Sequence, residues 1–190
     1  YNLLKGKRGI IFGALNDLSI AWKVAERAVE EGAEIVLTNT EISLRMGEIS
    51  KLAERCNAPI IAADATKVED LEALVDRAME HFGGKFDFVL HSVGMSPNVR
   101  KSIPYQSLNY TFLDRTLDIS AVSFHKVLQV LYAKDALNEW GSVVALTYMA
   151  AQRTFIGYSD MADAKALLES VARSFGAIYG RDRKVRVNTV

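Results

Sequence analysis

Two tyrosines and a lysine stand close together late in the chain, and side chains of these types can handle a proton. Tyr148, Tyr158 and Lys165 follow the strand-like run 142–147, and Tyr158 and Lys165 are seven residues apart. Seven residues are nearly two helical turns, so both side chains are expected on one face of a helix. A phenol has a pKa of about 10, and an adjacent ammonium lowers that pKa by favouring the phenolate. We therefore expect Tyr158 to donate a hydrogen bond or proton to an oxygen that gains negative charge. The alternative is a surface role, in which both tyrosines line a rim and Lys165 is a solvated charge.

Short β-branched runs alternate with helical patterns along the chain and must position this group. Strands are predicted over 8–12, 34–38, 59–63, 86–91, 142–147 and 184–190, and helices over 19–31, 42–56, 68–82, 112–137 and 160–179. In the second helix, one apolar stripe is expected to contain Ile42, Met46, Ile49, Leu52 and Ala53. Near-continuous apolar strands that alternate with helices predict a doubly wound parallel sheet, a Rossmann-like α/β fold in three layers.

Sheets of this kind bind ligands beyond the carboxyl ends of their strands. After the first strand, Gly13 supplies a tight turn, and the amides that open the helix at Ser19 can hold a pyrophosphate. The loop lacks the G-x-G-x-x-G fingerprint, because Ser19 and Ala21 stand where later glycines are expected. An ordinary loop in which Ser19 caps the helix is the alternative.

Residues after the next strands suggest which nucleotide would bind. No lysine or arginine immediately follows the second strand at 38–41, which favours NAD over NADP. After the third strand, Asp64 and Ala65 suit an adenine edge, or Asp64 simply caps the turn at 66–67. After the fourth, Gly94 lets the backbone approach a flat ring, and we interpret His91 as a packed strand-end residue rather than a catalyst.

Composition sets the outer limits. The 190 residues are 49% hydrophobic and 24% charged, which excludes collagen-like, disordered and low-complexity classes. Twenty-three basic residues balance 23 acidic ones, so no net charge favours nucleic acid, and no apolar run approaches the length of a membrane span. Cys56 is the single cysteine, no Cys/His spacing resembles a metal site, and a lone thiol fits the cytoplasm.

Taken together, these motifs resemble the enoyl-acyl-carrier-protein reductases of bacterial type II fatty-acid synthesis. That family is a divergent branch of the short-chain dehydrogenases/reductases, whose ordinary members space the pair as Tyr-x3-Lys, whereas this chain has Tyr158-x6-Lys165 with Tyr148 ten residues earlier. Further motifs fall in matching order: Gly13-Ala14 with 18–21, Asp64, 91–94, Asp118-Ile119-Ser120 and 185–188. Ser120 stands where ordinary members keep an asparagine.

The resemblance implies that NADH, rather than NADPH, reduces the C2=C3 bond of a 2-enoyl thioester in the last step of the elongation cycle. Tyr158 would then hydrogen-bond the thioester oxygen as it becomes an enolate, Lys165 would hold the nicotinamide ribose, and Tyr148 would line the pocket as a second candidate for proton handling. The residues expected to bind the dinucleotide are Gly13, Ser19, Ile20, Asp64, Ala65, Ser92, Val93, Gly94 and Lys165.

The resemblance also implies an acyl carrier protein as partner and a homotetramer built by pairing helices 112–137 and 160–179. It implies one catalytic domain over 1–190, without the substrate-covering segment with which the family continues after Val190. The basic loop 95–101 departs from the family pattern, and we interpret it as solvated rather than as a carrier-protein contact.

Two alternatives compete with this interpretation. One is a reductase or dehydrogenase of another acyl thioester or a carbonyl compound, although Ala145 stands where carbonyl-reducing members usually have serine. The other is a non-catalytic NAD-binding scaffold, such as a redox-sensing regulator.

Overall fold

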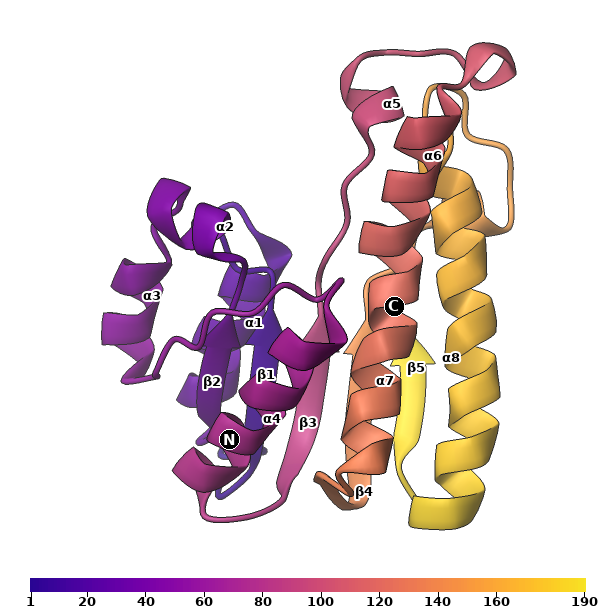
Figure 1. The fold of residues 1–190 in the computed structure, drawn as a ribbon. Helices are drawn as coiled ribbons and strands as arrows, with labels where there is room; N and C mark the ends of the chain where they lie inside the picture. Colours follow the sequence, from indigo (N-terminus) through magenta and orange to yellow (C-terminus); the bar gives the residue numbers. More distant parts are fainter.

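Five parallel strands form the sheet at the centre of the molecule (Figure 1). The computed structural model describes residues 1–190. The strands are β1 (Arg8–Phe12), β2 (Glu34–Thr38), β3 (Phe86–His91), β4 (Leu137–Ala145) and β5 (Arg186–Thr189), in the order β2-β1-β3-β4-β5. The predicted doubly wound α/β fold is confirmed. The switch of direction after β1 opens a crevice between β1 and β3 at their carboxyl ends.

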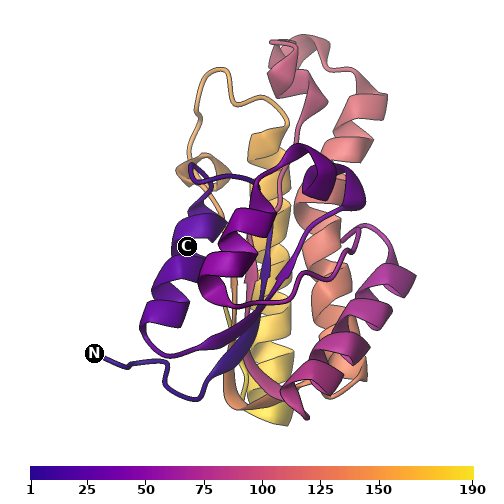
Figure 2. The same ribbon diagram turned by 90° about the vertical axis from the view of Figure 1, so that its left-hand side faces the viewer.

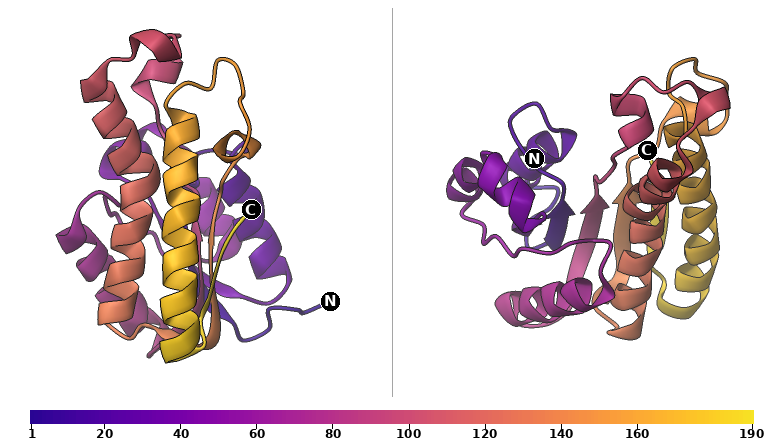
Figure 3. Two further views of the ribbon diagram at one scale, coloured as in Figure 1. Left: turned by 90° about the vertical axis from the view of Figure 1, so that its right-hand side faces the viewer. Right: turned by 45° about the horizontal axis from the view of Figure 1, so that its top comes forward.

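Helices cover both faces of the sheet (Figure 3, right). One face packs on α4 (Val68–Phe82), α7 (Ser123–Ala133) and α8 (Met161–Arg183), and the other on α1 (Ile20–Glu30) and α3 (Ile49–Cys56). Side chains alternate between the faces as a strand requires: Ile10 and Phe12 join the first core, and Ile11 joins the second. No helix is long and apolar enough to cross a membrane.

The predicted strand 59–63 is wrong as a strand, although its backbone does run beside β2. Leu37 N donates to Pro59 O (3.0 Å) and Ile61 N donates to Leu37 O (2.9 Å), but only the Leu37–Ile60 pair forms a bridge. The segment lies at the sheet edge with one neighbour, and Pro59 has no N–H to donate. It therefore guides the chain along β2 without extending the sheet.

The predicted helix 42–56 is two helices, α2 (Glu41–Met46) and α3. The chain is extended at Gly47, and Glu48 N donates to Leu15 O at 2.8 Å. A Cβ at Gly47 would lie 2.7 Å from that carbonyl oxygen. The single apolar stripe is also wrong, because Ile42 and Met46 are 70% and 82% exposed while Ile49 and Leu52 are buried. The break presses this turn against the loop after β1.

The predicted helix 112–137 is likewise divided. It consists of α6 (Tyr110–Leu117), a π-helical turn η2 (Asp118–Val122) and α7, and Leu137 already belongs to β4. The extra residue of the π-turn places Ser120 in the interior.

Short elements extend beyond the carboxyl ends of the strands (Figures 1 and 2). They are α5 (Pro97–Arg100), η1 (Tyr105–Ser107) and η3 (Met149–Ala151), together with the loop that leads into α8. In Figure 2 and in Figure 3 (left), that orange loop and the pink segment of α5 and η1 rise from the same end of the sheet. The site must therefore be sought at this end.

His91 ends β3 as a packed, uncharged residue. Its Nε2 lies 2.9 Å from Ser123 Oγ, and that hydroxyl donates to Ile119 O at 2.6 Å, so Nε2 is the protonated nitrogen. Complete burial, followed by the charge of Lys165, lowers the pKa of His91 to about 3. The structural interpretation of this histidine is confirmed.

Acid should therefore destabilise the fold through His91. An unfolded histidine binds its proton near pH 6.5, whereas the folded one stays neutral until about pH 3, so stability is lost as pH falls through this window. Between pH 7 and pH 4.5 this group alone should cost roughly 3 kcal/mol, from two pKa units at about 1.4 kcal/mol each. Urea unfolding at both values should show this loss in the wild type and not in His91→Gln, which keeps a donor for Ser123. An equal loss in both proteins would contradict the prediction.

Candidate active site

The loops after β1 and β3 meet at Gly13. This residue has φ +89°, and a Cβ on it would lie 1.8 Å from Ser92 O, so only glycine fits. A cavity of about 650 Å³ opens beside this contact, at the carboxyl ends of β1, β2 and β3. Its lining includes Gly13, Thr38, Asn39, Asp64, Ala65, Ser92, Val93, Gly94, Arg100, Arg115 and Asp118. The cavity thus extends from the residues after β2 to the residues after β3.

The structure brings six of the predicted dinucleotide residues together in this cavity: Gly13, Asp64, Ala65, Ser92, Val93 and Gly94. Ser19 and Ile20 do not line it. Ser19 Oγ instead accepts hydrogen bonds from the amides of Leu15 and Asn16 (both 3.2 Å), and Ile20 is largely exposed. Ser19 therefore stabilises the conformation of the loop after β1 through hydrogen bonds inside that loop.

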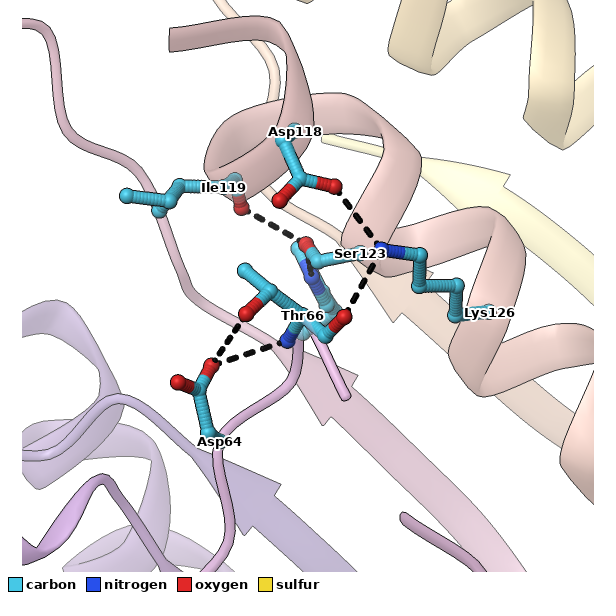
Figure 4. A network of polar contacts seen from close by, with 7 residues as sticks. Asp64, Thr66, Asp118, Ile119, Ser123 and Lys126 are labelled. Carbon is cyan, nitrogen blue, oxygen red and sulfur yellow. Dashed lines mark hydrogen bonds and ion pairs between the residues drawn. The ribbon is translucent and has the colours of Figure 1, made fainter. Parts of the chain in front are cut away.

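Asp64 fills the role of a turn cap while it lines the cavity (Figure 4). Its Oδ1 accepts from Thr66 N (2.9 Å) and from Thr66 Oγ1 (2.7 Å). Lys126 Nζ continues the network, since it donates to Thr66 O (2.7 Å) and to Asp118 Oδ1 (2.8 Å). The second oxygen of Asp64 makes no bond in this network.

Thr38 and Asn39, from the segment 38–41 on which the preference for NAD was argued, also line the cavity, whereas Arg100 and Arg115 were not predicted to do so. Thr38 Oγ1 is buried without a hydrogen-bond partner, and Asn39 Nδ2 donates to Ala14 O at 3.0 Å. Arg100 and Arg115 come from α5 and α6 and bring positive charge to the cavity. Part of the basic loop 95–101 therefore forms a wall of the cavity. No local sequence pattern indicates this, because the two arginines are far from β2 in sequence.

Alanine at Gly13 should disrupt this contact. The added methyl group would meet the Ser92 carbonyl, and the left-handed backbone would strain it further, so we expect loss of dinucleotide binding and destabilisation of about 2 kcal/mol or more. Gly83→Ala is the matched control: Gly83 also has positive φ (+71°), but no atom lies within 4 Å of its Cβ position. NADH titration and thermal unfolding of both variants measure the difference. Equal effects would show that the contact with Ser92 is unimportant.

Lys165 is buried beside this cavity. Its Nζ donates to Leu146 O at 2.7 Å and lies 3.7 Å from the Cβ position of Gly94. Burial lowers the pKa of the ammonium group. One N–H is used by Leu146, so two donors remain for a ligand near Gly94.

Tyr158 lies in the turn before α8, so the prediction that it shares a helix face with Lys165 is wrong. Its ring packs against Tyr148 (centroids 4.7 Å apart) and Phe155 (6.2 Å). Burial, and then the neighbouring Tyr148, raise the pKa of the Tyr158 phenol, opposite to the predicted lowering by Lys165. Tyr158 therefore stays a neutral donor at physiological pH.

A second cavity, of about 900 Å³, lies between the segment after α5 and the loop before α8. Phe155 belongs both to its lining and to the aromatic group with Tyr148 and Tyr158. The aromatic group thus borders the second cavity, and Lys165 lies beside Gly94 of the first. No group of three or more His, Cys, Asp or Glu side chains could hold a metal ion.

A family model described as enoyl-(acyl carrier protein) reductase matches residues 13–190. The chain belongs to the enoyl-acyl-carrier-protein reductase family. The reductase is 35% identical over 189 residues to the enoyl-[acyl-carrier-protein] reductase [NADH] 1 of Rhizobium meliloti, an alignment that covers 99% of this chain and 68% of that protein. The family resemblance of the motifs is thereby confirmed.

Solved structures show the same relationship. The crystal structure of FabI from Alistipes finegoldii is 72% identical and superposes with a TM-score of 0.97, covering all of this reductase and 72% of that chain. The FabI–NADH complex from the same organism gives 72% identity and a TM-score of 0.98, with all of this chain and 67% of that chain covered.

The residues of the first cavity fit a dinucleotide. Gly13 lets the loops after β1 and β3 meet at the cavity, because Ser92 O occupies the place of its side chain, and the orphaned Thr38 Oγ1 offers a hydrogen bond beside the ribose end. Positive charge from the two arginines suits the phosphates.

Proposed function

We propose that this reductase transfers hydride from NADH to C3 of a 2-enoyl thioester carried by acyl carrier protein, the last step of the fatty-acid elongation cycle. One observation carries the proposal: the Cβ position of Gly94, which lines the dinucleotide cavity, lies 3.7 Å from Lys165 Nζ and 3.8 Å from Met161 Cε, and Met161 N donates to Tyr158 O. A nucleotide-binding site and a proton-donating site therefore share one edge of the sheet.

NADH, when bound, supplies the hydride. Tyr158 donates a hydrogen bond to the thioester oxygen, which becomes negatively charged when hydride reaches C3 and the double bond shifts. The neutral state of its phenol suits a donor, and the packing on Tyr148 fixes the ring. Lys165 would hold the nicotinamide ribose with its two remaining N–H groups, and C2 would take one proton from solvent as the enolate collapses, so that hydride and proton together saturate the double bond.

The acyl chain occupies the cavity of about 900 Å³. Apolar walls from Val99, Ile103, Phe155 and Ile156 support this placement, because they offer hydrocarbon contacts on both sides. The acyl carrier protein itself stays outside and presents the thioester at the mouth.

The reductase acts in the cytoplasm as a homotetramer that pairs the outer faces of α6–α7 and α8. The half-exposed apolar side chains Leu167 and Ile178 on α8 support a buried interface there, and the single unpaired thiol of Cys56 fits a reducing compartment. Light scattering of the purified chain measures the assembly.

The activity test follows absorbance at 340 nm with a 2-enoyl thioester and either NADH or NADPH. We expect turnover with NADH and little with NADPH. Binding of NADH without reduction of any enoyl thioester would overturn the proposal in favour of a scaffold. A carbonyl-reducing activity is disfavoured, because Ala145 has no hydroxyl and Thr147 Oγ1 is bonded to Glu169 (2.9 Å).

A further inference from the structure

A carboxylate is buried beneath the loop that carries Tyr158, and no cation neutralises it directly. Asp160 is completely buried just before α8. It accepts hydrogen bonds from Ser96 Oγ (2.6 Å) and Asn98 Nδ2 (2.6 Å), and it shares the single hydrogen of Thr116 Oγ1 (2.9 Å) with Phe112 O (2.8 Å). All three donors are neutral side chains. Because a buried charge is costly unless it is well bonded, this set of donors must stay in place around the carboxylate.

The donors come from two segments that are distant from α8 in sequence. Thr116 belongs to α6, and Ser96 and Asn98 follow directly after the cavity residues at Gly94. On the other side, Ser120 Oγ accepts from Met95 N (3.0 Å) and donates to Met95 O (3.2 Å). The segment that begins at Gly94 is therefore held between Asp160 and the π-turn.

Asp160 also fixes the end of the Tyr158 loop. Ser159, between the two residues, has φ +48°, a conformation that a side chain disfavours. Its hydroxyl donates to Ile103 O (3.3 Å), and Met161 N donates to Tyr158 O (3.2 Å). This unfavourable backbone persists because contacts on both sides of it hold the chain.

We propose that Asp160 is a positioning residue that sets the place of Tyr158 relative to the nicotinamide-facing segment at Gly94. Asp160 stands two residues after Tyr158. Its carboxylate accepts hydrogen bonds both from the segment after Gly94 and from α6. The inference rests on the proposed function, in which Tyr158 donates to the thioester oxygen. Asp160 itself touches neither substrate nor cofactor.

A double-mutant cycle tests this role. Asp160→Asn places an amide N–H₂ against the side-chain donors that now bond to the carboxylate. We expect kcat to fall about tenfold to a hundredfold. The Kd for NADH, measured by fluorescence titration, should be unchanged. In the Tyr158→Phe background the same change should have little further effect on kcat. Asp87→Asn is the matched control, because Asp87 also accepts from several donors, including Arg8 N (3.0 Å) and Asn138 Nδ2 (3.3 Å), at the opposite end of the sheet. Its effect on kcat should be the same in both backgrounds.

Thr116 provides a milder pair of variants if Asp160→Asn does not fold. Thr116→Val removes one donor while keeping the shape of the side chain, and Thr116→Ser restores the hydroxyl. We expect Thr116→Val to lower kcat without changing the KM for NADH, and Thr116→Ser to recover it.

Four outcomes would overturn the proposed role of Asp160. Independent effects of Asp160→Asn and Tyr158→Phe, or a lower melting temperature with unchanged kcat, would overturn the proposal. If Asp160→Asn is insoluble, equal turnover of Thr116→Val and Thr116→Ser would overturn it instead. If Tyr158→Phe alone retains full turnover, the role of Tyr158 in the proposed function fails first, and the proposal for Asp160 fails with it.

Discussion

Replacing Tyr158 with phenylalanine should lower kcat about 10²-fold to 10³-fold, the typical cost of removing one donor to a developing oxyanion. The ring would keep its packing against Tyr148 and Phe155, so the change removes the hydroxyl and little else. Steady-state rates at 340 nm with an enoyl thioester and NADH measure the effect.

Tyr148→Phe is the matched control for this variant. Both tyrosines belong to the same aromatic group, but we expect the smaller loss at Tyr148 because it is assigned to orienting Tyr158. Affinity for NADH should remain at the wild-type value in both variants, since neither ring lines the dinucleotide cavity. A larger loss at Tyr148 than at Tyr158 would reverse the two roles.

Replacing Lys165 with methionine should raise the Kd for NADH about tenfold to a hundredfold. Two charge-assisted hydrogen bonds to the ribose are lost. Each contributes about 1.5–3 kcal/mol, and relaxation of the site around the ribose offsets part of that loss. Arginine should not rescue binding, because its planar fork does not match a buried site that is built around a single carbonyl, Leu146 O. Fluorescence titration of NADH measures both variants.

Unfolding measurements separate binding from stability at Lys165. Burial of the ammonium group already lowers its pKa, so an apolar side chain of similar length should leave the melting temperature unchanged or raise it. A variant that loses NADH affinity at constant stability supports the binding role. A parallel loss of both would make Lys165 a structural residue that ties α8 to β4.

The sequence was sufficient to predict the sheet and the edge at which the site lies. The strands β1 and β3 are short apolar runs, and Gly13 and the residues after β3 line the cavity at the edge where the sequence predicts a nucleotide. These features depend on local chemistry and on the general rule that parallel sheets bind ligands at one end.

Features that depend on contacts between distant segments were not predictable. The helix break at Gly47 requires the bond between Glu48 N and Leu15 O, and neither residue signals the other. Tyr158 and Lys165 were expected to meet along one helix, yet Tyr158 lies in the turn before α8, and Lys165 lies within α8 beside Gly94. The sequence did not predict a role for Asp160, because its three polar partners come close to it only after folding.

The π-helical turn η2 limits the deletions that the chain can accept. Deleting one residue from Asp118–Val122 would turn the segment into a regular helix and rotate the following side chains by about 100° relative to α6. Ser120 would then leave Met95, and Lys126 would leave Thr66, even if the deleted residue were Ala121 or Val122, which do not line the cofactor cavity. Natural variation in length should therefore be absent from this turn.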